Sequence, residues 1–270
     1  MTVDIQQIIA IAKTAGEAIM DVYQTTNFSI ARKADNSPVT AADMAAHHVI
    51  EAGLQAISGL PVLSEESTLI PYTIRQEWED YWLIDPLDGT REFIKRNGEF
   101  TVNIALIKQH QPILGVVYAP AKSLLYYAKK GQAAYKQSGV EAPVKITVKR
   151  LDENNIIIAG SRSHADKRLE NFIANITQKN QQSPNVVTLG SSLKVCLVAE
   201  GIADVYPRLG PTSEWDTAAA QCIIESAGGA LNSLDGVSFS YNNKESLLNT
   251  SFFAHSGGHD WSQYLEKVSE

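Results

Sequence analysis

Two aspartates that follow an apolar run are the first candidates for chemistry in this chain. Asp85 comes directly after the run 81–84, and Asp88 lies three residues further along, so a tight turn brings both carboxylates to one point. Between them, Pro86 has a fixed φ angle and is predicted to end the strand, and the backbone carbonyl of Leu87 can turn inward. Two carboxylates and a carbonyl are hard oxygen ligands of the kind that Mg²⁺ prefers. The stretch therefore predicts a divalent cation site at the end of a buried strand.

The two residues that come next favour a phosphate group beside the cation. Gly89 permits a positive φ angle or a close approach of the backbone. Thr90 begins a predicted helix, and the free N–H groups of a helix start can bind phosphate. The stretch also has a purely structural interpretation, an Asp-Pro turn followed by an N-cap aspartate, and this is the better interpretation of such a motif in isolation.

Further acidic residues occupy comparable places along the chain. Glu65 and Glu66 follow a short apolar run, and Asp216 lies in the first turn of a predicted apolar helix. Asp43 stands three residues after Thr40, which is the spacing of a capping box. Taken singly, each has an ordinary alternative, a solvated loop charge or the capping of a helix. Taken together, their similar placement favours a functional interpretation of the Asp85–Asp88 motif over the structural one.

The elements that must position these residues differ between the two halves of the chain. Apolar side chains at helical spacing predict a helix over 4–24, and residues 38–40 are predicted to open a second helix. Apolar runs at 61–63 and 81–84 predict strands. Three more strand-like runs separated by short turns predict an antiparallel meander, at 100–107, 112–119 and 123–128.

From about residue 150 strand-like and helical segments alternate, which is typical of an α/β unit. We predict an α+β domain over 1–150, with a large antiparallel sheet and most of the acidic residues, and an α/β domain over 151–270 that contributes Asp216. The segments of the second half are predicted strands at 156–159, 186–189 and 203–206 and predicted helices at 165–177, 191–200 and 215–227.

Composition limits the classes of function. The 270 residues are 44% hydrophobic and 20% charged, as in an ordinary globular protein, and they allow one large or two modest domains. The net charge of −7 argues against a nucleic-acid polymer or an anionic membrane as partner. The two cysteines, Cys196 and Cys222, make no disulfide framework and are expected to pack as small hydrophobic residues in a reducing compartment. No transmembrane run and no signal sequence is evident, so we expect a cytoplasmic protein.

The three acidic motifs, at 65–66, 85–90 and 215–216, resemble in type, spacing and order those of the lithium-sensitive, Mg²⁺-dependent phosphatases of the inositol monophosphatase superfamily. The resemblance covers nearly the whole chain. It implies the layered αβαβα sugar-phosphatase fold of the α/β class, with the site between the two halves. It also implies two or three Mg²⁺ ions. Their implied ligands are Glu65, Asp85 and the Leu87 carbonyl for the first, Asp85, Asp88 and Asp216 for the second, and Glu65 and Asp43 for a third, weaker ion.

Within this superfamily, the stretches 161–164, 190–194 and 203–211 look like those of the bacterial CysQ-type 3'(2'),5'-bisphosphate nucleotidases. Inositol monophosphatases usually have a small residue where Lys194 stands. The residues thereby implied to contact the nucleotide or its second phosphate are His164, Ser191, Lys194 and Arg208, and those implied to contact the reacting phosphate are Glu65, Leu87, Asp88, Gly89, Thr90 and Asp216. Ordinary alternatives are a helix cap for His164, a solvated helix charge for Lys194 and a loop residue for Arg208.

The resemblance implies hydrolysis of the 3'-phosphate of adenosine 3',5'-bisphosphate to AMP and phosphate, by a water that the Thr90 hydroxyl orients with the support of Asp43. Glu65 or Glu66 would assist in accepting the proton of that water, and the Gly89 and Thr90 amides would support the phosphoryl oxygens. A small-molecule nucleotide is then the partner, and a monomer is favoured over a dimer.

Two other functions stay open at this point, an inositol or sugar phosphate monoesterase of the same fold and a non-catalytic metal- or nucleotide-binding module that regulates a partner. The resemblance also allows peripheral association with the cytoplasmic face of the inner membrane, for which the acidic composition gives no support.

Overall fold

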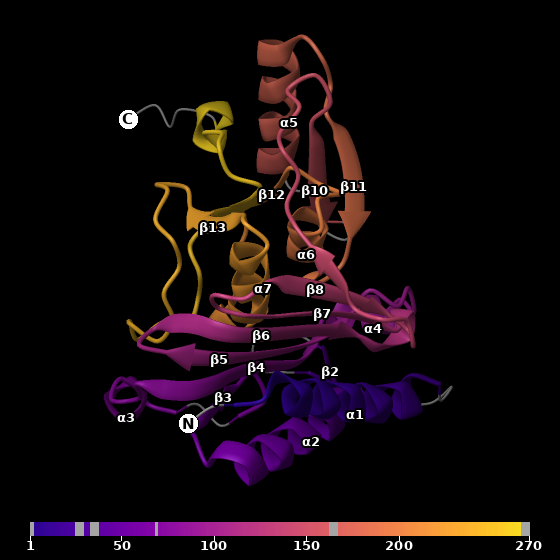
Figure 1. The fold of residues 1–270 in the computed structure, drawn as a ribbon, viewed down its shortest axis with the longest axis vertical. Coiled ribbons are helices and arrows are strands. Elements are labelled where there is room, and N and C mark those ends of the chain that lie inside the picture. Colours follow the sequence, from indigo (N-terminus) through magenta and orange to yellow (C-terminus); the bar gives the residue numbers. More distant parts are fainter. Residues whose placement is uncertain (1–2, 25–29, 33–37, 68–69, 162–166, 266–270) are drawn as a thin grey trace.

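The protein is built from five layers of helices and sheets (Figure 1). The computed structural model describes residues 3–24, 30–32, 38–67, 70–161 and 167–265. A pair of helices, a seven-stranded sheet, a second pair of helices, a five-stranded sheet and an outer helix follow one another from bottom to top in Figure 1. The predicted αβαβα architecture is thereby confirmed.

The first layer consists of α1 (Ile5–Gln24) and α2 (Ala41–Ser58), which confirm the two helices predicted for the N-terminal part. Their apolar faces are buried against one side of the large sheet, where Ile8 and Ile50 lie in the same core cluster as Trp82. Helix spacing of the apolar residues thus places one stripe of each helix on the sheet. The short strands β1 (Ile30–Arg32) and β2 (Pro38–Thr40) pair antiparallel before α2.

The seven-stranded sheet has its strands in chain order. The predicted meander forms its centre and is confirmed, and two further short strands extend it. All neighbours pair antiparallel except the first two strands, which are parallel. The strands are β3 (Val62–Ser64), β4 (Asp80–Asp88), β5 (Thr101–Lys108), β6 (Gln111–Ala119), β7 (Leu124–Lys129), β8 (Ala134–Ser138) and β9 (Val144–Ile146).

The five-stranded sheet is mixed rather than purely parallel, with strand order β11-β10-β12-β14-β13. The three predicted strands are parallel neighbours, as expected of an α/β unit. The strands β14 and β13 pair antiparallel. The sequence did not predict them, because apolar runs as short as theirs also occur in loops. The strands are β10 (Ile157–Ser161), β11 (Asn185–Leu189), β12 (Val205–Arg208), β13 (Ala230–Ser233) and β14 (Phe252–His255).

The helices of the second half cover both faces of this smaller sheet. The outer helix α5 (Lys167–Asn180) packs through Phe172 and Ile176 into a cluster with sheet residues. Helices α6 (Leu193–Ala199) and α7 (Glu214–Ser226) lie between the two sheets (Figure 1). The remaining short helices are α3 (Tyr72–Arg75), α4 (Thr90–Ile94), η1 (Pro120–Lys122) and η2 (Trp261–Tyr264).

Helix α7 ties the two halves together, because it comes from the second half of the chain and packs on the large sheet of the first. Gly115 in β6 makes this close packing possible, since a Cβ there would lie 2.2 Å from the carbonyl oxygen of Ala219 in α7. The chain passes between the sheets after residue 146 and before residue 157. A domain boundary near residue 150 stays a prediction. Among the described helices, none combines the length and apolar character needed to cross a membrane.

Candidate active site

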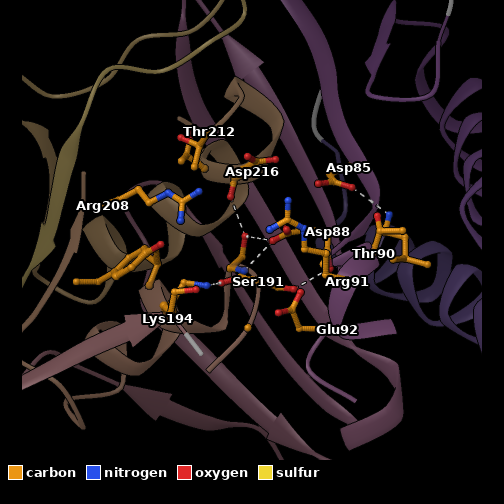
Figure 2. Close-up of a pocket in the computed structure, with 18 of the residues that line it drawn as sticks. Asp85, Asp88, Thr90, Arg91, Glu92, Ser191, Lys194, Arg208, Thr212 and Asp216 are labelled. Carbon is orange, nitrogen blue, oxygen red and sulfur yellow. Dashed lines mark hydrogen bonds between the residues drawn. The ribbon is translucent and has the colours of Figure 1, made fainter. Parts of the chain in front are cut away.

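A cavity of about 490 Å³ opens between the two halves of the chain, at the end of β4 and beside the first residues of α4, α6 and α7. Asp85 and Asp88 reach it from β4, and Asp216 reaches it from α7 (Figure 2). Lys194 and Arg208 lie on the opposite side of the pocket from Asp85 in the same view. Acidic and basic side chains from distant segments therefore face a common space.

The strand that supplies the first two aspartates differs from the prediction. Pro86 does not end it: β4 continues to Asp88, with a break in the pairing register between Asp85 and Asp88. Proline has no N–H to give to the ladder, so the strand accommodates it with an irregularity instead of stopping. The Leu87 amide turns back and donates to Asp85 Oδ1 at 3.0 Å. This local turn holds the two carboxylates on the same side of the strand end.

Three carboxylates meet at this point. One oxygen each from Asp85, Asp88 and Asp216 lies within 4.8 Å of the other two. Glu65 lines the same cavity, and the negative charges of Glu65 and Asp43 both act on Asp85, which places these five acidic residues in one cluster. The grouping expected from three separate motifs is thus present.

The cluster is strongly repulsive without a cation. Burial, followed by the charges of neighbouring carboxylates, raises the pKa of Asp85 well above its usual range. Burial also raises the pKa of Asp88, although the Lys194 charge and hydrogen bonds from Ser192 act in the opposite direction. The pKa of Asp216 rises to about 8, first through burial and then through the charge of Asp88. A divalent cation would relieve this repulsion.

The donor set fits a hydrated, oxygen-preferring cation such as Mg²⁺. Close carboxylate oxygens supply the charge, and two buried polar residues lie beside the cluster on β5. Asn103 Oδ1 and Thr101 Oγ1 are buried and have no hydrogen-bond partner among the residues that the structure describes. These two residues pair across the ladder with Asp85 and Asp88. Neither residue is among those that line the cavity, so the fit to Mg²⁺ rests on the carboxylates.

Helix α4 starts at the floor of the cavity with Gly89 and Thr90, both of which line it. Gly89 has a φ angle of 94°, and a Cβ there would lie 2.2 Å from Ser191 Oγ. Both the backbone conformation and the space therefore require glycine. Thr90 is the first residue of the helix, as predicted.

Asp216 has both of the roles that the sequence suggested as alternatives. Its Oδ2 accepts a hydrogen bond from the Ser213 amide at 2.9 Å and completes a capping box at the start of α7. The same carboxylate belongs to the acidic cluster. Capping fixes the direction of the side chain, so it supports the site and does not exclude it.

Ser191 is held by the protein backbone. Its Oγ lies 2.7 Å from the carbonyl oxygen of Asp88 and 2.8 Å from that of Glu99, and its φ angle is 53°. The residue lines the cavity, but its hydroxyl joins the two halves of the chain. A contact between this hydroxyl and a nucleotide stays a prediction.

Lys194 is buried, so the alternative of a solvated charge on a helix face is wrong. Its Nζ donates to the Ser191 carbonyl at 2.7 Å and lies 5.3 Å from the centre of the Tyr206 ring. Arg208 donates from Nη2 to the Pro211 carbonyl at 2.8 Å, and its charge lowers the pKa of Asp216 against the larger effect of burial. These two basic side chains face the acidic cluster, so the cavity has a negatively charged side and a positively charged side.

Other predicted residues lie outside the described part of the chain, and some cavity residues were not predicted. His164 and the side chain of Thr40 are outside the described residues, so their predicted roles rest on the sequence. Tyr206 and Thr212 line the cavity, and Ser192 contacts Asp88 directly. The stretches 190–194 and 203–211 contain Ser192 and Tyr206, but nothing in residue type alone separates them from their neighbours.

The fold and the site define a layered α/β protein with a carboxylate cluster between two sheets that could hold a metal ion. The chain belongs to the inositol monophosphatase family, whose model matches residues 2–266. It is 48% identical over 250 residues to the 3'(2'),5'-bisphosphate nucleotidase CysQ of Salmonella typhimurium, an alignment that covers 92% of this chain and 98% of that protein.

Solved structures agree with this assignment. The crystal structure of CysQ from Bacteroides thetaiotaomicron, a bacterial member of the inositol monophosphatase family, superposes with a TM-score of 0.81 at 40% identity, covering 94% of this chain and 97% of the other. The extragenic suppressor protein suhB of Bartonella henselae superposes with a TM-score of 0.79 at 23% identity, covering 98% and 99%, and shows the shared fold alone.

Proposed function

We propose that this chain is a metal-dependent 3'(2'),5'-bisphosphate nucleotidase that hydrolyses the 3'-phosphate of adenosine 3',5'-bisphosphate to AMP and phosphate. The observation that carries the proposal is the cavity itself, in which a carboxylate cluster faces Lys194 and Arg208. The nearly full-length identity to a CysQ nucleotidase supports the same substrate class. A small-molecule nucleotide is then the partner.

The acidic cluster is proposed to hold two or three Mg²⁺ ions. Glu65, Asp85 and the Leu87 carbonyl would provide one set of ligands, and Asp85, Asp88 and Asp216 a second set. Glu65 and Asp43 would provide a third, weaker set. Bound there, the cations supply positive charge that neutralises the cluster, attracts phosphate to an acidic protein and activates water.

The residues of the chain itself are proposed to orient the reaction. Thr90, at the first turn of α4, would hold the attacking water through its hydroxyl, with Asp43 in support. Glu65 or Glu66 would accept the proton of that water. The Gly89 and Thr90 amides at the cavity floor would donate to phosphoryl oxygens as negative charge develops on them. No covalent intermediate with the protein is needed, because an oriented water can attack in line.

The basic side of the cavity distinguishes a nucleotide bisphosphate from an inositol phosphate. A substrate with a second phosphate carries negative charge away from the reacting group, and Lys194 and Arg208, which line the cavity opposite Asp85, would stabilise that charge. The Tyr206 ring beside Lys194 adds an apolar surface for a base or ribose. Arg208 Nε is buried and has no hydrogen-bond partner within the described ranges, so it retains a donor for an anion.

The metal assignment is tested by Asp85→Asn, which keeps the size of the side chain and removes one charge from the centre of the cluster. We expect loss of phosphate release from adenosine 3',5'-bisphosphate with an unchanged circular dichroism spectrum. Asp235→Asn, on an exposed residue, is the matched control and should retain full activity. Near-normal turnover by the Asp85 variant would contradict the assignment.

The substrate assignment is tested by the double variant Lys194→Ala and Arg208→Ala. We expect kcat/KM for adenosine 3',5'-bisphosphate to fall far more than kcat/KM for inositol monophosphate. Lys122→Ala with Arg150→Ala removes the same two charges from exposed positions and serves as control. Equal losses on both substrates would favour the monoesterase alternative, and metal binding without any phosphate release would favour a regulatory module.

The proposal extends to a monomer in a reducing compartment such as the cytoplasm. Cys196 and Cys222 are both buried and free, in agreement with that setting. Gel filtration at micromolar concentration tests the oligomeric state, and elution at twice the chain mass of 29.5 kDa would overturn it.

A further inference from the structure

Ser192 contacts two of the three clustered aspartates at once. Its amide donates to Asp88 Oδ2 at 2.8 Å, and its Oγ lies 2.7 Å from the Asp216 carbonyl oxygen and 3.2 Å from Asp88 Oδ2. The shorter distance identifies the Asp216 carbonyl as the acceptor of the hydroxyl hydrogen. The residue is buried just before α6, and it joins β4 through its amide to the start of α7 through its hydroxyl.

Asn103 connects the same serine to the third aspartate. The Asn103 Nδ2 donates to Ser192 Oγ at 3.0 Å, and Asn103 on β5 lies directly opposite Asp85 on β4. Residues directly opposite in an antiparallel pair project from the same face, with Cβ atoms about 5 Å apart. Asn103 is almost fully buried, and its Oδ1 has no hydrogen-bond partner within the part of the chain that the structure describes. An amide with an unused acceptor thus lies beside Asp85, the most buried of the three clustered aspartates.

We propose that Asn103 and Ser192 form a positioning pair that sets the spacing of Asp85, Asp88 and Asp216 and so determines how tightly the cluster binds a divalent cation. The proposal rests on the proposed function for the identity of the cation. A directed chain of donors, from Asn103 Nδ2 to Ser192 Oγ to the Asp216 carbonyl, runs across the boundary between the two halves. This chain of hydrogen bonds fixes the separation between the aspartates of β4 and Asp216 of α7, which lie on different elements.

Neither residue takes part in the chemistry directly. Loss of the Ser192 hydroxyl leaves the amide contact to Asp88 in place, but it removes the hydrogen-bonded link between Asn103 on β5 and the Asp216 carbonyl at the start of α7. One restraint on the spacing of the carboxylates is then lost, and their mutual repulsion moves Asp216 away from Asp85 and Asp88. Metal affinity should fall, since outer hydrogen bonds of this kind typically account for about 10- to 100-fold in affinity.

The test uses Ser192→Ala, Asn103→Leu and the double variant in the full-length chain. Ser58→Ala is a closely matched control, because the Ser58 hydroxyl also accepts from a side-chain N–H, that of Trp82, and lies within hydrogen-bonding distance of a carbonyl, that of Leu54. Mg²⁺ binding is measured by isothermal titration calorimetry on substrate-free protein. Phosphate release is then measured against Mg²⁺ concentration.

We expect each single variant to raise the Mg²⁺ dissociation constant about 10-fold or more, and the double variant to add little, because the two residues act through one chain of hydrogen bonds. At saturating Mg²⁺ the substrate KM should change less than about twofold, which separates metal positioning from general structural damage. Ser58→Ala should lower the melting temperature and leave the Mg²⁺ affinity unchanged.

A Mg²⁺ dissociation constant in Ser192→Ala within twofold of the unmodified chain would overturn the proposal, and so would additive effects in the double variant or an equal loss in Ser58→Ala. The variants could change Mg²⁺ binding as expected while the unmodified chain releases no phosphate from the nucleotide. That result would support the positioning pair and refute the proposed function. Absence of any divalent cation binding to the unmodified chain would refute both.

Discussion

Removing one charge from the acidic cluster should stabilise the protein when no metal is present. The change is Asp216→Asn, which keeps the side chain's size and can still accept the Ser213 amide hydrogen bond that caps α7. In the metal-free fold, the pKa of this carboxyl rises from 3.8 to about 8, through burial and the charges of Asp88 and Glu65. Neutralising this carboxyl therefore removes the unfavourable burial and repulsion of its charge, which are largest when the carboxylate is ionised.

The direction and size of this stability change follow from the difference between the pKa of Asp216 in the folded state and its pKa in the unfolded state. A carboxyl with a raised pKa in the fold contributes stability below about pH 4, and that contribution is lost as the pH rises towards 8. The shift of about 4 units corresponds to roughly 6 kcal/mol at about 1.4 kcal/mol per unit. Asp216 is partly exposed, and the repulsion is shared with neighbouring carboxylates. After a discount for solvent screening, we expect the substitution to raise the free energy of unfolding by about 2 kcal/mol. That corresponds to a rise in Tm of about 5 °C for a chain of this length.

Differential scanning calorimetry in EDTA at pH 5 and pH 8 measures the effect. We expect Asp216→Asn to melt higher than the unmodified chain at pH 8, with a smaller difference at pH 5. Added Mg²⁺ should raise the Tm of the unmodified chain much more than that of the variant, because ligand binding stabilises only the form that binds it. An unchanged or lowered Tm at pH 8 in EDTA, with Asp235→Asn neutral as the surface control, would refute the electrostatic reasoning.

Three further outcomes are expected. Gly89→Ala should lower kcat at least 10-fold while the chain still folds, because the new Cβ would collide with Ser191 Oγ at a backbone φ of 94°; full activity in a phosphate-release assay would contradict the geometry. The two cysteines should react with a thiol reagent only after denaturation, since burial raises the pKa of both thiols; rapid labelling of native protein would exclude this packing. Asp204→Asn should destabilise the fold by about 2 kcal/mol in urea titration, since it removes the buried partner of Lys149 Nζ at 2.8 Å; an unchanged unfolding midpoint would show that the ion pair contributes nothing.

The sequence predicted most of the elements because their signals are local. Helical spacing identified α1 and α2, and alternating apolar runs identified the meander of the large sheet. It missed β13 and β14, whose short runs become strands only by pairing at the edge of an existing sheet. It also ended β4 too early at Pro86, since a proline that breaks a strand in isolation is accommodated by an irregular register when the neighbouring strand is fixed.

The chemistry of the site was likewise partly local. The turn from Asp85 to Thr90 carries its own information, because the proline, the glycine and the spacing of the two aspartates act over a few residues. The sequence by itself therefore determined which acidic motifs the protein has and which ligand chemistry they suit.

Only the tertiary structure decided which distant residues meet. Two contacts join segments about 90 to 100 residues apart: that between Ser191 and the carbonyl of Asp88, and the hydrogen bond from Asn103 to Ser192. The burial of Lys194 depends on the packing around α6. Such contacts leave no periodic trace in the chain, because they arise when two sheets and the helices between them close around one cavity. Residue type and spacing specify the parts, and the packing of the layers sets the distances at which those parts can hold a cation.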